Sequence, residues 1–241
     1  PDVSVDAAEK LGARSLRHML AADSSISTAT VACPSAADVK AALDTTQGCP
    51  SVLFDLLEVA DMCGCQAASI VVDLRQHPSV SLLQPTLAQF QGPALCFFMP
   101  EVALTRYEIG ELMRSHGAGY RGTTCRYGSG LLRGYELGEV MFVISGAKFS
   151  VFDPSGAYLL DDLNEDDGVH QVEATGKEYD YVASGLPQRF PDQFRPFSHY
   201  GFSGETSLPG TVVRIPLRTP NQAARSSIHS KPFSQDANVI N

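Results

Sequence analysis

Cysteine, histidine and serine can bind metals or act as nucleophiles, so their spacing is the first guide to chemistry in this chain. Cys63 and Cys65 are separated by one residue, too close for the paired ligands of a structural zinc, and no second pair with histidine follows. The dispersed cysteines predict free thiols in a reducing compartment, packed as small apolar side chains. Only His77 and His116 lie beside glycine or proline turns that place a side chain for chemistry. No Gly-x-Ser-x-Gly elbow occurs, so neither a metal site nor a serine hydrolase is predicted.

Composition excludes further classes of function. The chain has 241 residues, of which 44% are hydrophobic, and a formal net charge of -9. It can bury a sizeable core, but it lacks the overall basic character of a nucleic-acid-binding domain. One group of arginines keeps a nucleic-acid module open as a third possibility: Arg114, Arg121, Arg126 and Arg133. The acidic run at 161–167 predicts a solvated loop.

The sequence carries no signal for membrane insertion or secretion. Its apolar runs of five or six residues are too short to span a bilayer, and no signal peptide is visible. We therefore expect a cytoplasmic protein, with the nucleus as the alternative location. The start at Pro1 is typical of a piece excised from a longer polypeptide.

Helix and strand signals alternate along the chain. Helical spacing and caps predict helices at 6–20, from Pro34, from Pro50 to Gly64, from Thr105 to Gly117 and at 131–135. Apolar runs predict strands at 67–73, 94–98, 139–144, 147–152 and 211–217. The segments 23–32 and 74–93 are predicted as loop and connection, and the glycine-rich 117–122 as mobile. This order predicts an α/β fold of the α+β type, a two-layer sandwich in which helices cover one face of a mixed, mostly antiparallel sheet.

The helix after Pro50 is the most informative of these elements. Leu53, Leu56, Leu57 and Ala60 recur at the spacing that buries one helix face, and Gly64 is placed for a left-handed cap.

Several separate motifs, in order, resemble a sacsin repeat. They lie at 73–77 (Asp-Leu-Arg-Gln-His), 81–83, 87–95, 145–146, 152–154, 190–194 and 210–218. The resemblance covers roughly 51–225 and leans towards the plant-type sacsin-like proteins. It implies a helical lead-in at 1–50, an ATPase-like domain at 51–225 and a polar tail or linker at 226–241.

Sacsin repeats resemble the amino-terminal ATPase domain of the ninety-kilodalton heat-shock chaperones and the wider histidine-kinase-type ATPases. In that family one helix carries a Glu that orients the attacking water and, four residues later, an Asn that binds Mg²⁺. Asp55 and Val59 occupy those positions here. The Asp side chain is one methylene shorter than Glu, so its carboxylate is retracted by about 1.5 Å. A base displaced by this distance implies a loss of about a hundredfold in reaction rate. Val59 offers no oxygen to a cation, so the resemblance implies that this magnesium ligand is lost.

The other nucleotide motifs are altered to different degrees. Met99 stands where an Asp accepts the adenine amino group, although a slip of one or two residues presents Glu101 instead. The glycine loop is partly kept: Cys125 replaces its first glycine, but Gly128, Ser129 and Gly130 remain, and their backbone amides could receive an anion. The motif Gly210-Thr211 is intact.

Each position also has a purely structural interpretation. Gly128 and Gly130 are compatible with a tight turn, Thr211 with an ordinary strand residue, and Asp55 with a solvated surface acid. Val59 and Met99 are typical core residues.

Two functions compete. The first is a degenerate chaperone-type ATPase-like domain that has lost nucleotide turnover, holds neither metal nor cofactor, and contacts client proteins and neighbouring domains of the same long chain. The second is a slow ATPase that binds Mg-ATP through its glycine loop and Thr211, with Asp55 as the base.

Overall fold

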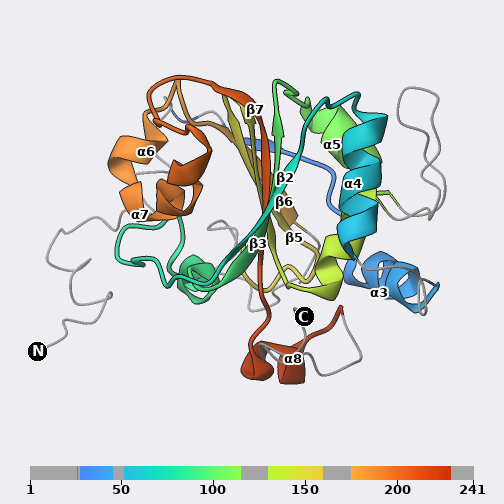
Figure 1. Ribbon diagram of the computed structural model, residues 1–241. Helices are drawn as coiled ribbons and strands as arrows, with labels where there is room; N and C mark the ends of the chain where they lie inside the picture. Colours follow the sequence, from blue (N-terminus) through green and yellow to red (C-terminus); the bar gives the residue numbers. More distant parts are fainter. Residues whose placement is uncertain (1–25, 27, 46–51, 115–129, 160–174, 229–241) are drawn as a thin grey trace, which may run out of the picture.

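One twisted antiparallel sheet organises the computed structural model, which describes residues 26, 28–45, 52–114, 130–159 and 175–228 (Figure 1). Its seven strands follow the order β1-β6-β5-β4-β7-β3-β2. They are β1 Thr28–Thr30, β2 Ser69–Asp73, β3 Ala94–Pro100, β4 Met141–Gly146, β5 Lys148–Asp153, β6 Thr175–Asp180 and β7 Leu208–Pro216. Every strand pairing in the described ranges is antiparallel, so the sheet is not mixed.

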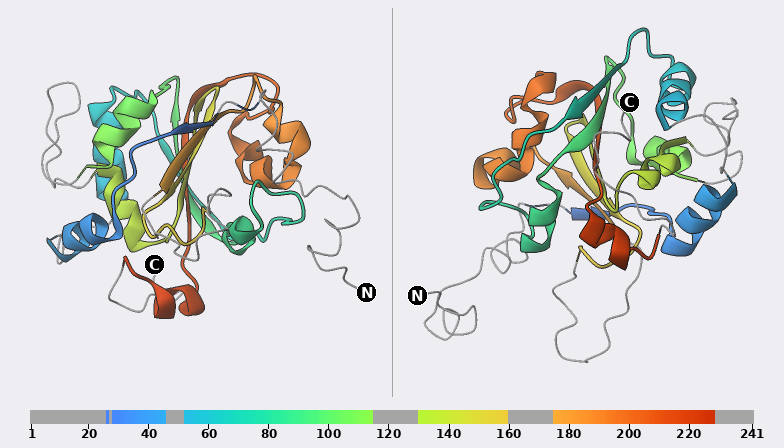
Figure 2. Two further views of the ribbon diagram at one scale, coloured as in Figure 1. Left: turned by 180° about the vertical axis from the view of Figure 1, so that it is seen from behind. Right: turned by 60° about the horizontal axis from the view of Figure 1, so that its bottom comes forward.

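Helices cover both faces of this sheet, which corrects the expectation of a single covered face. One side carries α3 Ala36–Thr45, α4 Val52–Met62, α5 Arg106–Leu112 and the 3-10 helix η2 Gly130–Glu136. The other carries α6 Leu186–Arg189, α7 Pro191–Phe194 and the 3-10 helices η1 Pro85–Phe90 and η3 Arg195–Tyr200. The views of Figures 1 and 2 place the sheet between these two groups, with α8 Pro220–Arg225 at one end.

The strand sequences explain the two layers of helices. Successive side chains of a strand point to opposite faces, and β4 is apolar at both sets of positions. Met141 and Val143 belong to one buried cluster, whereas Phe142 and Ile144 belong to a second. The second cluster is rich in aromatic rings, including a stacked pair of Phe142 and Phe149 with centroids 6.2 Å apart. Between β6 and β7, where no helix was predicted, the chain folds into α6, α7 and η3, whose side chains complete this cluster.

Most local signals are confirmed. Thr105 caps α5 in a reciprocal box with Glu108, and Ser35 and Asp38 exchange the same two hydrogen bonds ahead of α3. The strands predicted at 139–144 and 147–152 are β4 and β5, which form a hairpin, and Gly64 has the left-handed φ of 71° that its position after α4 predicted.

Three local expectations need correction. The segment predicted as a loop at 23–32 contains β1, which pairs with β6, and the connection at 74–93 contains η1. On α4, Leu56 and Ala60 are buried as expected, but Leu53 and Leu57 are 43% and 49% exposed. The buried side of α4 is instead centred on Val52, Asp55 and Val59.

Three predicted segments lie outside the described residues: the helix at 6–20, the acidic run at 161–167 and the glycine-rich segment 117–122.

Candidate functional site

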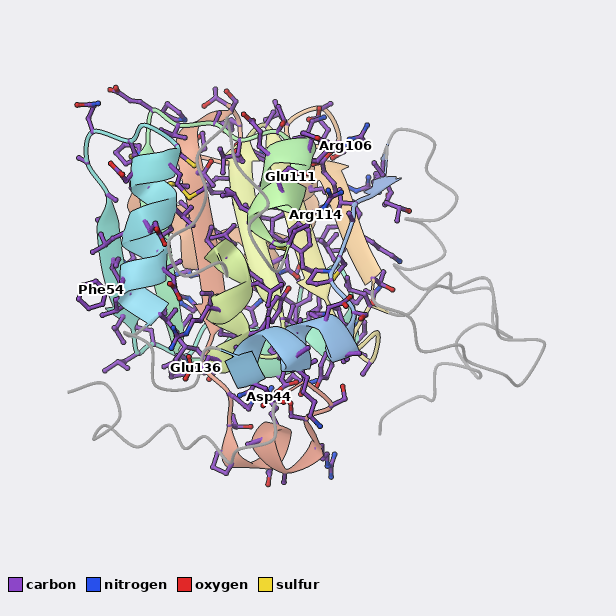
Figure 3. The ribbon with its side chains drawn as sticks, turned by 90° about the vertical axis from the view of Figure 1, so that its right-hand side faces the viewer. Asp44, Phe54, Arg106, Glu111, Arg114 and Glu136 are labelled. Carbon is purple, nitrogen blue, oxygen red and sulfur yellow. The ribbon has the colours of Figure 1, made fainter. Side chains whose placement is uncertain are left out.

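The predicted nucleotide positions that the structure describes lie on one side of the sheet. Asp55 and Val59 come from α4, Met99 from the end of β3, and Thr211 from β7, where it is directly opposite Met99. Figure 3 shows this side of the molecule, with η2 between α4 and α5 and with α3 below. Gly128 and Ser129 lie outside the described residues, and Gly130 begins η2. Helix spacing and strand register therefore bring four widely separated positions to one layer.

Asp55 is a buried acid, not the solvated one that its amphipathic helix allowed. Its side chain is 1% exposed, and its Oδ2 lies 3.4 Å from Nη1 of Arg133 on η2, which is itself 5% exposed. Arg133 also donates from Nε to Oε2 of Glu136 at 3.0 Å. An arginine from η2 therefore lies against the carboxylate that would have to act as a base.

Val59 and Met99 are inaccessible to solvent. Both are 0% exposed, and both belong to the buried cluster on this side of the sheet, together with Leu112 and Leu131. These four side chains carry no group that can bind a cation or accept a hydrogen bond from adenine usefully. In this structure the two predicted contact positions are therefore part of the hydrophobic core.

The Thr211 hydroxyl is engaged by the protein itself. It donates to the carbonyl of Val102 at 2.7 Å and lies 2.8 Å from the hydroxyl of Ser145, its direct neighbour on β4. Leu104 donates its backbone N–H to the Ser145 hydroxyl at 2.6 Å. The two hydroxyls thus fasten the segment between β3 and α5 to the sheet.

Glu101 does not take the place of Met99. It follows β3 in a turn, it is exposed, and it has a left-handed φ of 62°. Its backbone N–H donates to the carbonyl of Pro209 at 2.8 Å, next to the Pro100 and Gly210 pair that closes the β3 and β7 ladder. Of the two residues, it is Met99 that lies inside the core, opposite Thr211 in the strand register.

Gly130 has a steric role that its place in a glycine loop did not indicate. Its φ is 47°, and a Cβ atom on it would lie 2.4 Å from the backbone carbonyl oxygen of Leu112. Only glycine allows η2 to begin so close to the end of α5.

A second polar cluster, which includes the His77 that its neighbouring proline turn had singled out, lies at the other face. Arg75 donates to the Asp73 carboxylate from Nε at 2.7 Å and from Nη2 at 2.8 Å. Nε2 of His77 lies 3.0 Å from Oδ2 of the same carboxylate. Arg214 on β7 is 1% exposed and donates to the carbonyls of Phe90 and Gly92, both at 2.7 Å. The motif Asp-Leu-Arg-Gln-His was the signal that could have pointed to this cluster.

The charges of this second cluster are set by hydrogen bonding and burial. The Arg75 guanidinium, helped by His77, holds the pKa of Asp73 well below its usual range. Burial lowers the pKa of His77 and lowers that of Arg214 to about 10. Because Arg214 bridges to main-chain carbonyls that lead into β3, the cluster is best explained as a support for the connection at 74–93.

The described residues offer no group of three or more His, Cys, Asp or Glu side chains that could hold a metal ion. Cys33, Cys63, Cys65 and Cys96 are free cysteines. Within the same ranges, no helix is both long enough and apolar enough to cross a membrane.

The described residues define an α+β domain with one antiparallel sheet, in which the positions predicted to contact magnesium and adenine are apolar and buried. Residues 36–240 match the sacsin domain, and the chain belongs to that family. It is also similar to human sacsin, with 26% identity over 187 residues, which cover 75% of this chain and 4% of the human protein. The chain therefore spans only a small part of the length of that relative.

Proposed function

We propose that this sacsin domain is a structural and protein-interaction module that retains a histidine-kinase and heat-shock-chaperone ATPase-like fold without nucleotide turnover. The observation that carries the proposal is the complete burial of Val59 and Met99 in one core cluster. A nucleotide would need an oxygen ligand for magnesium at the first position and an acceptor for the adenine amino group at the second. Neither side chain supplies one.

Two further contacts support the same proposal. Arg133 lies against the Asp55 carboxylate, and the Thr211 hydroxyl is bonded to Val102 and Ser145. Each of these groups would have to exchange its present partner for water or nucleotide, and a buried group that loses its partner costs about 1 to 3 kcal/mol.

The partners proposed for the module are client proteins and neighbouring domains of the same long chain. The match to 4% of human sacsin supports this context, because a domain of this size would be one part of a much longer polypeptide. The same proposal places the protein in the cytoplasm, with the nucleus as the alternative. It includes no binding to nucleic acid or to membranes. The alternative, a slow ATPase with Asp55 as base, rests on the described Gly130 and Thr211 of the retained motifs.

Calorimetric titration of the full 241-residue chain with Mg-ATP separates the two functions. We expect no binding in the micromolar range, either with Mg-ATP or with a nonhydrolysable analogue, and titration with magnesium alone serves as the control. Micromolar, metal-dependent binding would overturn the proposal and favour the slow ATPase.

A restored variant tests whether a nucleotide cavity could be reopened. The triple change Asp55→Glu, Val59→Asn and Met99→Asp returns the family residues, but it places new polar groups at two positions that are now fully buried. We expect it to lower the urea midpoint without conferring ATP binding, since each buried polar group without a partner costs about 1 to 3 kcal/mol. Recovery of Mg-ATP binding would instead mean that the scaffold has stayed open to nucleotide.

A further inference from the structure

Large apolar side chains that remain exposed are concentrated in one part of the described structure. Eight such side chains are exposed, and six of them occur within residues 53–74: Leu53, Phe54, Leu57, Val71, Val72 and Leu74. The first three belong to α4, the next two to β2, and Leu74 follows directly. Single exposed apolar residues are ordinary, but a group of this kind on consecutive elements marks an interaction surface.

Strand β2 is an edge of the sheet, and its sequence does not protect it. It stands last in the strand order, with β3 on its inner side and no other described strand on its outer side. Ser-Ile-Val-Val-Asp contains neither lysine nor proline, and Val71 and Val72 are 40% and 38% exposed on opposite faces. The opposite edge, β1, is only three residues long and reads Thr-Ala-Thr. Edges in soluble proteins are normally shortened, as β1 is, or protected by charged side chains. The only charged residue of β2 is Asp73 at its end, which is buried and bound to Arg75, so no charge protects positions 70–72.

The apolar side of α4 lies next to this edge. Leu53 and Leu57 are four residues apart, and Phe54 extends their surface, so the three share the outer side of the helix. Figure 3 shows α4 on the β2 side of the sheet and Phe54 at the outer margin of the molecule. The edge strand and the helix face therefore form one surface, which we call the β2 edge surface.

We propose that a second copy of this chain covers the β2 edge surface, with β2 pairing antiparallel to its own copy across a two-fold axis at Val71. In that register Val71 is opposite Val71, Ile70 is opposite Val72, and Ser69 is opposite Asp73. No two like charges face each other, and β-branched side chains meet on both faces, which is the favourable kind of cross-strand pair. A two-fold axis requires an antiparallel pair, the arrangement already found at all six described pairings of the sheet.

The same axis brings the helices into the interface. Directly opposite residues of an antiparallel pair lie on the same face, so the axis is perpendicular to the sheet and both α4 helices lie on one side of it. A strand of five residues is roughly 17 Å long and buries too little surface by itself, since a stable interface takes about 800 Å² from each partner. Leu53, Phe54 and Leu57 supply further apolar area. Each chain has one such edge, so the assembly closes as a dimer and does not extend into a fibre.

Sedimentation velocity over a range of concentrations tests the proposal with the full 241-residue chain. One chain has a mass of 25.9 kDa, so the dimer is expected at 2 × 25.9 = 51.8 kDa. Val71→Lys places two ammonium groups against each other at the axis, and we expect it to raise the dimer dissociation constant at least about 100-fold. The control Val80→Lys changes a side chain that is 95% exposed outside this surface and should leave the dimer intact. Circular dichroism checks that both variants are folded.

Two further measurements keep the proposal testable if Val71→Lys does not fold. Leu57→Glu alters only the helix and should also weaken the dimer, and the backbone amides of Val71 and Val72 should lose protection from hydrogen exchange on dilution. A monomer at every concentration, or a dimer indifferent to both substitutions, would overturn the proposal. Protection of these amides in a monomer would also overturn it, because another segment of the same chain would then cover the edge. No nucleotide is involved, so the result is independent of the proposed loss of ATP turnover.

Discussion

Arg133 and Asp55 form an ion pair between η2 and α4, with 3.4 Å between Nη1 and Oδ2 and with both side chains at or below 5% exposure. The pair joins two elements that sequence motifs treat as separate parts of a nucleotide site. A carboxylate held by a buried guanidinium is favoured in that arrangement because breaking it would leave a charge uncompensated. The geometry therefore assigns Asp55 a role in attaching α4 to η2.

The first prediction is that Asp55→Ala destabilises the domain by about 3 kcal/mol, since it leaves the Arg133 charge buried with fewer partners. The free energy of unfolding in urea measures this loss. Glu136→Gln is the matched control, because Glu136 binds the same arginine but is 40% exposed, and we expect a change below about 1 kcal/mol. Equal effects of the two substitutions would contradict the assignment.

The second prediction concerns the hydroxyl of Thr211. Thr211→Val keeps the shape of the side chain but leaves the carbonyl of the half-buried Val102 and the buried hydroxyl of Ser145 with one partner fewer. We expect a loss of about 1 to 3 kcal/mol in urea unfolding. Thr30→Val, at an exposed strand position, should change stability by less than about 0.5 kcal/mol. If Thr211→Val were equally neutral, the hydroxyl would not fasten this segment to the sheet.

Short-range signals predicted the elements well because their causes are local. The capping boxes at Ser35 and Thr105, the left-handed Gly64 and the hairpin at Gly146 each depend on a few adjacent residues. The second helical layer was missed because α6, α7 and η3 are short and their stability comes from aromatic contacts with β4 and β5, which are distant in the chain. Hydrophobic spacing also misjudged Leu53 and Leu57, since it locates an apolar face but not the neighbour that covers it.

The candidate site shows the same division. Family spacing placed Asp55, Val59, Met99 and Thr211 on elements that the fold does bring to one side of the sheet. It could not predict that Arg133 pairs with Asp55, because that contact spans 78 residues and depends on the start of η2 at Gly130. The elements that carry these four positions could be predicted from the sequence, whereas the partners of their side chains required the fold.

The third prediction is a loss of stability at mildly acidic pH through His77. This ring is buried against Asp73, with Arg75 and Arg214 also acting on it, and burial lowers its pKa in the folded protein. The unfolded chain then takes up the proton first, so the free energy of unfolding should fall as the pH drops below about 6.5. His77→Gln should flatten this dependence between pH 7 and 5, whereas His199→Gln, at an exposed position, should not.

A further loss is expected below about pH 4, with the same sign. The pKa of Asp73 is held low in the folded protein, chiefly by its hydrogen bonds to Arg75, so the unfolded chain again binds the proton first. Urea unfolding across the pH range measures both steps. A stability that stays constant from pH 7 to 5 would contradict the assignment to His77.

The last prediction separates the steric role of Gly130 from its place in a glycine motif. Gly130→Ala forces a Cβ atom to within 2.4 Å of the Leu112 carbonyl oxygen and places alanine at a φ of 47°. Gly64→Ala, the control, places alanine at a φ of 71° with nothing within 4 Å of the added atom. The control should cost about 1 kcal/mol from backbone conformation alone, and Gly130→Ala should cost at least about 2 kcal/mol because α5 and η2 must also move apart. Urea unfolding without nucleotide measures both losses of stability. Equal losses would mean that close packing does not require this glycine. A larger loss at Gly130 would show that the fold requires the glycine whether or not an anion binds.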